Sequence, residues 1–210
     1  MENFSQDLHE ILQELGWNEP IRLLGHSMGG RIALQFAAQY PQLVKQLVIV
    51  DIGPTSDWAS MGKTMEMIAS VPVPFPSRGE AKTYLKETFS QRYGNMMADF
   101  FMTNLKAQPG DGEAKPWSWR FDSRGIQQIL ENSRTQDYWD LFHKLSVPTL
   151  LLRGEKSTYL LPEEFSKVQA NNDNIQGVEI LGAGHWLHAE QPVATLKALK
   201  EFFLVAANLS

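Results

Sequence analysis

Apolar residues along the chain recur with two periods in turn, that of a helix and that of a strand. Five of them near the start have the spacing i, i+4, i+7, i+8 and i+11, and they are Phe4, Leu8, Ile11, Leu12 and Leu15. This spacing predicts an amphipathic helix, which Gly16 ends. A short apolar strand at 21–25 ("IRLLG") follows, then an apolar helix that stops at Pro41, then a strand at 42–51. Helices and strands in this order predict a parallel sheet covered by helices.

The pattern changes over the middle of the chain. From 53 to 145 we find helical stretches such as "GEAKTYLKETF" and no convincing strand. The strand pattern returns with "VPTLLLRG" at 147–154, and the helical "PEEFSKVQ", the strand "GVEILG" and a last helix from Pro192 follow. We therefore expect an α/β core made of 1–52 and 146–210, interrupted by a helical cap insertion at 53–145.

Composition narrows the class of protein. A chain of 210 residues is long enough for one core with an insertion. The net charge is -5 and the basic residues are scattered, which argues against nucleic acid or an anionic membrane as a partner. We find no apolar run of membrane-spanning length and no apolar segment at the start typical of a secretory signal, so a cytoplasmic protein is expected. The absence of cysteine excludes disulfides and thiolate chemistry.

The stretch "LLGHSMGG" contains the first candidate for chemistry. Gly25-His26-Ser27-Met28-Gly29 fits the pattern G-x-S-x-G, with a predicted strand before it and a predicted helix after it. On such a turn the serine is strained and raised above the sheet, while the helix N-terminus favours developing negative charge. Ser27 is the predicted nucleophile, and a glycine-rich turn without chemistry is the alternative.

A serine nucleophile needs a base, and two histidines follow the last predicted strand. His185 lies in the glycine-rich loop "GAGHWLHAEQP", from which its ring could reach the serine. Its alternative role is to cap the last helix. His188 could face the same way, but we expect it to begin that helix. His26, beside the serine, is expected to pack against or orient the loop.

The acid that orients the base has three candidates. Asp51 ends the strand that follows the nucleophile's helix, so it lies at the same edge of the sheet as Ser27. In many proteins of this architecture the acid follows the strand after the insertion, where this chain has Ser157, with Glu155 two residues earlier. We favour Asp51 over Glu155, with Asp57 third. The alternative role of Asp51 is to cap the turn that follows it.

Four motifs together carry a family resemblance: "GHSMGGRIALQFA", "VIVDIGP", "LLLRGEKSTYL" and "GAGHWLHAEQP". In this order they resemble the α/β-hydrolase superfamily, and more narrowly its small cap-bearing bacterial esterases whose acid follows the strand after the nucleophile helix. The resemblance implies a triad of Ser27, Asp51 and His185, with the backbone N–H of Met28 as one oxyanion donor. It also implies ester hydrolysis with no metal or organic cofactor.

The chain departs from the family pattern before the motif. Only one helix precedes the strand at 21–25, so we expect a truncated fold with a mostly parallel half-sheet of about four strands, the C-terminal half of the usual fold. The loop that normally supplies a second oxyanion N–H is then absent, and such a donor contributes about 10²–10³ in rate. Strand 21–25 would also have an unpaired edge, which predicts a homo-oligomer or a second polypeptide that pairs with it.

The insertion is expected to form a lid over Ser27. Its aromatic and methionine side chains suit either an apolar acyl pocket or the insertion's own core. These side chains are Trp58, Met61, Met65, Phe75, Met96, Met97, Phe100, Phe101, Trp117, Trp119 and Trp139.

The function expected from these features is that of a serine hydrolase acting on small or medium carboxylic esters or thioesters. Two alternatives stay open. One is a truncated, non-catalytic remnant that serves as a binding module. The other is a lyase or carbon–carbon hydrolase that uses the same triad, because the site rather than the fold sets the reaction.

Overall fold

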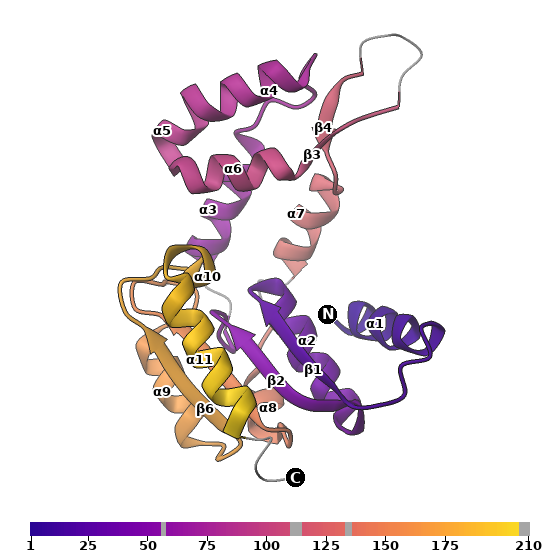
Figure 1. Cartoon of the computed structure of the whole chain (residues 1–210), viewed down its shortest axis with the longest axis vertical. Coiled ribbons are helices and arrows are strands. Elements are labelled where there is room, and N and C mark those ends of the chain that lie inside the picture. Colours follow the sequence, from indigo (N-terminus) through magenta and orange to yellow (C-terminus); the bar gives the residue numbers. More distant parts are fainter. Residues whose placement is uncertain (56–57, 110–114, 133–135, 206–210) are drawn as a thin grey trace. The chain divides into compact units, whose positions relative to one another are not determined.

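The computed structural model describes residues 1–55, 58–109, 115–132 and 136–205. The chain divides into two compact units, drawn in Figure 1. Unit 1 comprises Met1–Asp57 and Gln136–Ser210, and unit 2 comprises Trp58–Thr135. Unit 2 lies inside the limits 53–145 predicted for the insertion. It ends before the predicted limit, and helix α8 (Trp139–Lys144) belongs to unit 1.

Unit 1 is built on a four-stranded parallel sheet in the order β1-β2-β5-β6. Its strands are β1 (Ile21–His26), β2 (Val44–Val50), β5 (Thr149–Gly154) and β6 (Ile175–Ile180). Every residue of β5 is buried, as is every residue of β2 except Lys45, which is typical of a parallel sheet covered on both faces. The predicted parallel half-sheet flanked by helices is confirmed.

Helices cover both faces of this sheet (Figure 1), and alternate side chains of the strands pack against the two helical layers. Leu47, Ile49 and Leu151 pack in one cluster with side chains of four helices. These helices are α1 (Glu2–Glu14), α2 (Met28–Gln39), α8 and α9 (Pro162–Ala170), and the turn η1 (Pro41–Leu43) joins α2 to β2. Val48 and Leu150 face the other way, toward α10 (Leu187–Glu190) and α11 (Pro192–Val205).

Helix α1 forms as predicted, but most of its apolar stripe is not buried. Leu12 is buried against α2, whereas Ile11 and Leu15 are 51% and 58% exposed. Leu24 on the edge strand β1 is also 48% exposed.

Unit 2 is mainly helical, as predicted, but it also contains a two-stranded sheet that the sequence did not indicate. Its helices are α3 (Trp58–Ala69), α4 (Arg78–Tyr84), the π-helix η2 (Leu85–Phe89), α5 (Ser90–Tyr93), α6 (Asn95–Thr103) and α7 (Ser123–Asn132). The antiparallel strands are β3 (Leu105–Ala107) and β4 (Trp117–Trp119). Three residues are too few for an alternating pattern to be recognised.

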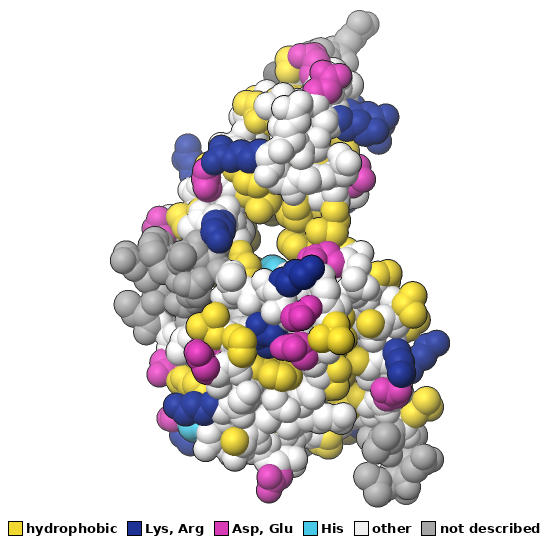
Figure 2. Space-filling view, turned by 90° about the vertical axis from the view of Figure 1, so that its left-hand side faces the viewer, with side chains coloured by type: hydrophobic (Ala, Val, Ile, Leu, Met, Phe, Trp, Pro, Cys, Tyr) yellow, Lys and Arg dark blue, Asp and Glu magenta, His cyan; other side chains and the backbone are white. Residues whose placement is uncertain are grey.

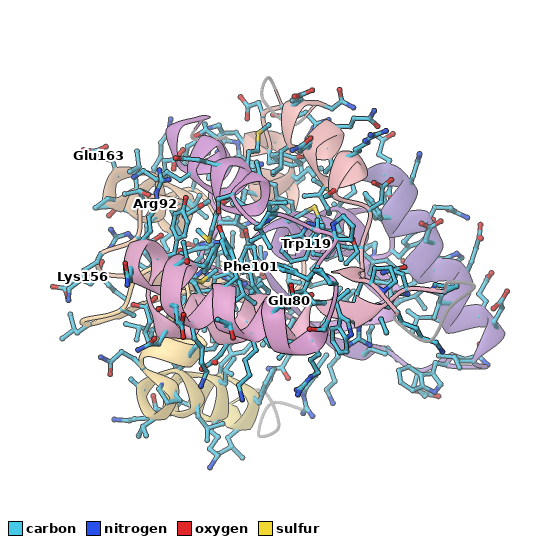
Figure 3. The ribbon with its side chains drawn as sticks, turned by 90° about the horizontal axis from the view of Figure 1, so that it is seen from above. Glu80, Arg92, Phe101, Trp119, Lys156 and Glu163 are labelled. Carbon is cyan, nitrogen blue, oxygen red and sulfur yellow. The ribbon has the colours of Figure 1, made fainter. Side chains whose placement is uncertain are left out.

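Several aromatic residues of the insertion pack against one another inside unit 2. Phe101 contacts Phe89 and Trp119, with ring centroids 4.9 and 5.3 Å apart, and Figure 3 shows Phe101 and Trp119 close together. For these residues the structure favours the role of an internal core. Trp139 instead belongs to unit 1, where the ammonium of Lys167 lies 4.4 Å from its ring centroid. The side chains of Trp58 and Met61 lie outside the described part.

The surface carries charges of both signs. Lysine, arginine, aspartate and glutamate are interspersed over the face drawn in Figure 2. None of the helices in the described ranges is both long enough and apolar enough to span a membrane.

Candidate active site

Ser27 occupies a sharp turn between β1 and α2. Its backbone has φ 55° and ψ -122°, and it and Asp51 are the two residues other than glycine with positive φ in the part of the chain described. Gly25 is required by the turn, because a Cβ there would lie 2.2 Å from the carbonyl oxygen of Gly29. A Cβ at Gly30 would lie 2.8 Å from Ile52. The sequence folds here into the strained elbow that the motif predicts.

The elbow is fixed to the neighbouring strand by its backbone. The N–H of Ser27 donates to the carbonyl of Val50 at 3.0 Å, and Val50 directly precedes Asp51. Met28 is the first residue of α2, so its N–H has no acceptor within the helix. An N–H at this helix end can donate to negative charge that develops beside Ser27.

Asp51 lies at the carboxyl end of β2, with no solvent exposure and with φ 53°. Its Oδ1 accepts a hydrogen bond from the N–H of Gly154 at 2.9 Å. Its Oδ2 accepts from Nδ1 of His185 at 2.8 Å and from the hydroxyl of Ser157. A buried carboxylate needs such donors, so these three bonds account for an acid at the end of an apolar strand.

The bond to Asp51 decides which nitrogen of His185 carries the proton. An ionised carboxylate only accepts hydrogen bonds, so Nδ1 of the ring must be protonated. In the neutral ring Nε2 then keeps its lone pair and can act as a base. The ring of Tyr159 stacks on that of His185, with centroids 3.7 Å apart and planes 20° apart, and fixes its tilt.

The other two candidates for the acid have different positions. Glu155 accepts a hydrogen bond from the N–H of Gly182 at 2.7 Å, and no contact of its carboxylate with His185 is found within the described ranges. Asp57 lies outside the described residues. The structure thus pairs His185 with Asp51.

Sequence reasoning missed the role of Ser157. This buried residue stands where many related folds have their acid, and its hydroxyl donates to Asp51 while accepting from the N–H of Tyr159 at 3.1 Å. The signal was present in the sequence, since a hydroxyl at the usual place of the acid can serve as a donor to an acid that comes from elsewhere.

His26 links the elbow to the loop of His185. Its Nε2 lies 2.9 Å from the carbonyl oxygen of His185, and the two ring centroids are 4.6 Å apart. Burial, and next the charge of His185, lowers the pKa of His26 to about 4. The ring is therefore neutral at pH 7, and because a carbonyl only accepts, Nε2 carries its proton. The predicted orienting role of His26 agrees with this geometry.

The prediction that His188 begins the last helix is wrong. It lies in the separate short helix α10, and the backbone leaves the helical region at Gln191 before α11 starts at Pro192. Its ring meets that of His26 edge-on at 5.0 Å. Burial, followed by the charge of His185, lowers the pKa of His188.

The three predicted triad residues come from segments that meet at the carboxyl edge of the sheet. Ser27 is bonded through its backbone to the residue before Asp51, its neighbour His26 contacts His185, and His185 is bonded to Asp51. In parallel α/β sheets this edge is where binding sites form. No group of three histidine, aspartate or glutamate side chains in the described ranges is arranged to hold a metal ion.

A family model and several known proteins match this chain. The model of the alpha/beta hydrolase fold matches residues 1–192. The sn-1-specific diacylglycerol lipase ABHD11 of Mus musculus is 32% identical over 205 residues, which cover 96% of this chain and 64% of that protein. The chain spans 62% of the corresponding protein of Danio rerio. It therefore covers slightly less than two thirds of the length of these curated relatives.

Two solved structures share the fold over nearly the whole chain. A marine microorganism esterase is 29% identical with a TM-score of 0.76, and the match covers 96% of this chain and 76% of that one. E-2-(acetamidomethylene)succinate hydrolase is 25% identical with a TM-score of 0.76, and the match covers 95% and 72%. Both resemble this chain in the arrangement of its elements.

Proposed function

The chain belongs to the alpha/beta hydrolase fold family, and we propose that it is a serine hydrolase that cleaves carboxylic esters or thioesters through an acyl-enzyme on Ser27. The observation that carries the proposal is the hydrogen bond from Nδ1 of His185 to the buried Asp51. It leaves Nε2 as a base at the sheet edge where Ser27 sits on its strained turn. The esterases and lipases among its relatives support the same class of reaction.

The reaction proceeds in two halves. The hydroxyl of Ser27 attacks the substrate carbonyl while its proton passes to Nε2 of His185, and His185 then gives that proton to the departing alcohol or thiol. Water, deprotonated by His185, attacks the acyl-enzyme, and His185 then gives the proton to the oxygen of Ser27 as the bond to the acyl group breaks and the acid is released. Asp51 holds the ring and stabilises its positive charge in both halves, without itself taking a proton.

The N–H of Met28 is the proposed donor to the oxyanion. Each such donor contributes about 3–4 kcal/mol to the stability of the transition state. A site with this donor alone would be slower than one with two, but the triad would still accelerate the reaction.

Turnover of short-chain p-nitrophenyl esters tests the proposal. The wild type should hydrolyse p-nitrophenyl butyrate, whereas Ser27→Ala should abolish turnover and Asp51→Asn should reduce it strongly. Equal rates in all three proteins would exclude this mechanism. A protein without turnover and without covalent labelling of Ser27 by a fluorophosphonate would instead be the non-catalytic binding module.

The substrate is proposed at the level of its class, a small or medium acyl ester or thioester. A panel of acyl chain lengths should include a diacylglycerol, because the mouse relative is named for that substrate. A carbon–carbon substrate in the same panel tests for the alternative reaction. Unit 2 is proposed to be the cap that sets the chain-length preference.

We also propose that the chain forms a homo-oligomer through β1. This strand is the last in the sheet, and in the described residues β2 is its sole strand partner. The side chain of Leu24 on this strand is half exposed, and an unpaired apolar edge strand is a template for association. Light scattering after size exclusion should give a dimer or larger for the wild type and a monomer for Leu24→Lys. A monomeric wild type would contradict the proposal.

A further inference from the structure

The loop that carries His185 is held by its main chain as well as by the His185 side chain. We infer that Glu190 and His26 are positioning residues, which together fix the peptide groups around His185 and thereby aim its ring. The inference rests on the proposed function, in which His185 is the base. It assigns a role to two side chains that are outside the proposed triad.

Glu190 binds the loop on both sides of His185. One carboxylate oxygen accepts from the N–H of Gly184 at 2.7 Å, and the other accepts from the N–H of Trp186 at 3.0 Å. These N–H groups belong to the residues immediately before and after His185. Hydrogen bonds to an ionised acceptor are stronger than those between neutral groups. A single carboxylate on α10 therefore restrains the chain on both sides of the base.

His26 binds a carbonyl that lies between those two N–H groups along the main chain. Its Nε2–H donates to the carbonyl of His185 at 2.9 Å. Because this ring is neutral and its Nε2 must be protonated beside a carbonyl, the direction of the bond is defined. Since His26 directly precedes Ser27, this bond ties the position of the base to that of the predicted nucleophile.

Three polar groups of the main chain around His185 are thus held: the N–H of Gly184, the carbonyl of His185 and the N–H of Trp186. Fixing them fixes the direction in which the Cβ of His185 leaves the backbone. Tyr159 and Asp51 then restrict only the rotation of the ring. A catalytic group must be placed to within about 0.5 Å, so both levels of restraint bear on the rate.

The space around the loop agrees with this role. A Cβ added to Gly184 would lie 3.2 Å from a carboxylate oxygen of Glu190. On the other side, the carbonyl of Gly184 packs so closely against β5 that a Cβ at Gly154 would lie 2.1 Å from its oxygen. The loop is therefore fitted between the carboxylate and the end of the strand, with little freedom to shift.

The test compares Glu190→Ala and His26→Leu, which remove the bonds, with His26→Gln, whose side-chain amide can donate from near the place of Nε2. Glu163→Ala is the matched control, because Glu163 is an exposed acidic residue on α9 that points outward in Figure 3. For p-nitrophenyl butyrate we expect Glu190→Ala and His26→Leu to lower kcat on the order of 10- to 100-fold with little change in KM. His26→Gln should recover most of the rate, and Glu163→Ala should not change it.

A measurement independent of turnover accompanies the kinetics. The Nδ1 proton of His185, bonded to Asp51, should give a low-field proton resonance in the wild type that shifts or broadens in Glu190→Ala and His26→Leu. An unchanged resonance and unchanged kcat in both variants would overturn the inference while leaving the triad intact. Loss of the proposed function itself would look different, since the wild type would then lack turnover and Ser27 labelling from the outset.

Discussion

His185 and Asp51 are 134 positions apart in the sequence, yet Nδ1 of the imidazole lies 2.8 Å from Oδ2 of the carboxylate. The bond joins the loop after β6 to the carboxyl end of β2. Because Asp51 is fully buried and accepts two further hydrogen bonds, its carboxylate is held in one orientation. The histidine is therefore oriented by a group that cannot easily move.

The first prediction concerns the choice between Asp51 and Glu155. An amide at position 51 can present an N–H toward Nδ1 and so favours the wrong tautomer of His185, which lowers kcat by about 10⁴ in a serine hydrolase of known mechanism. Asp51→Asn should therefore reduce the hydrolysis of p-nitrophenyl butyrate by about 10³–10⁴. Glu155→Gln, the matched change in the other carboxylate, should reduce it far less. If Glu155→Gln had the larger effect, the acid would be Glu155 and not Asp51.

The second prediction concerns Ser157, the residue whose role the sequence did not reveal. Ser157→Ala removes one of the three donors to the buried carboxylate of Asp51. Losing a partner of a buried polar group costs about 1–3 kcal/mol. Urea denaturation should show a loss of this size, together with a fall in kcat smaller than that of Asp51→Asn. A variant as stable and as active as the wild type would show that the hydroxyl does not support the acid.

Comparison of sequence and structure shows which features a local pattern can predict. The buried strands and the serine elbow were predicted because the apolar runs, the glycines and the following helix are all adjacent in the sequence. For the acid that orients His185, the sequence left three candidates, although Asp51 was favoured. The end of β2 and the loop after β6 meet only in the folded sheet, so their contact could not be read from neighbouring residues. The hydrogen bonds that Ser157 donates to Asp51 and that Glu190 accepts from the loop of His185 depend on loop conformation. The spacing of apolar residues in the sequence does not reveal such a conformation.

The exposed stripe of α1 and the hairpin of unit 2 could not be foreseen from the sequence for the same reason. The stripe on α1 has the correct spacing for a buried face, but spacing does not reveal whether anything covers it, and Ile11 and Leu15 are exposed. The β3–β4 hairpin is formed by pairing of three-residue segments, and pairing is a long-range property. Similarly, α10 ends at a turn too short to interrupt a helical pattern.

The third prediction concerns the close packing of Gly154 against the loop of His185. A Cβ at this position would lie 2.1 Å from the carbonyl oxygen of Gly184, so Gly154→Ala must displace the loop or the strand. We expect a loss of stability of about 1–3 kcal/mol and a loss of activity. Gly62→Ala is the control, because a Cβ there meets no atom within 4 Å, and alanine in helix α3 should be neutral or slightly stabilising. Equal stability and activity of the two variants would contradict the packing described.

The fourth prediction concerns stability as a function of pH. The pKa of His26 is about 4 in the folded protein and near 6.5 in the unfolded chain. Between these values the unfolded state binds more protons, so stability falls as the pH is lowered from about 6.5 to about 4. The difference in the free energy of unfolding that His26 accounts for is at most about 3 kcal/mol. His26→Gln should lose less stability than the wild type between pH 7 and pH 4.5, and parallel losses would show that His26 does not titrate in this way.

The most direct test of the central claim, that Ser27 is the nucleophile activated by His185 and Asp51, is covalent labelling by a fluorophosphonate followed by intact mass and peptide mapping. The account predicts one adduct on Ser27 in the wild type, slower labelling of Asp51→Asn, and none of Ser27→Ala. An unlabelled wild type, or a Ser27→Ala variant labelled as fast as the wild type, would contradict it.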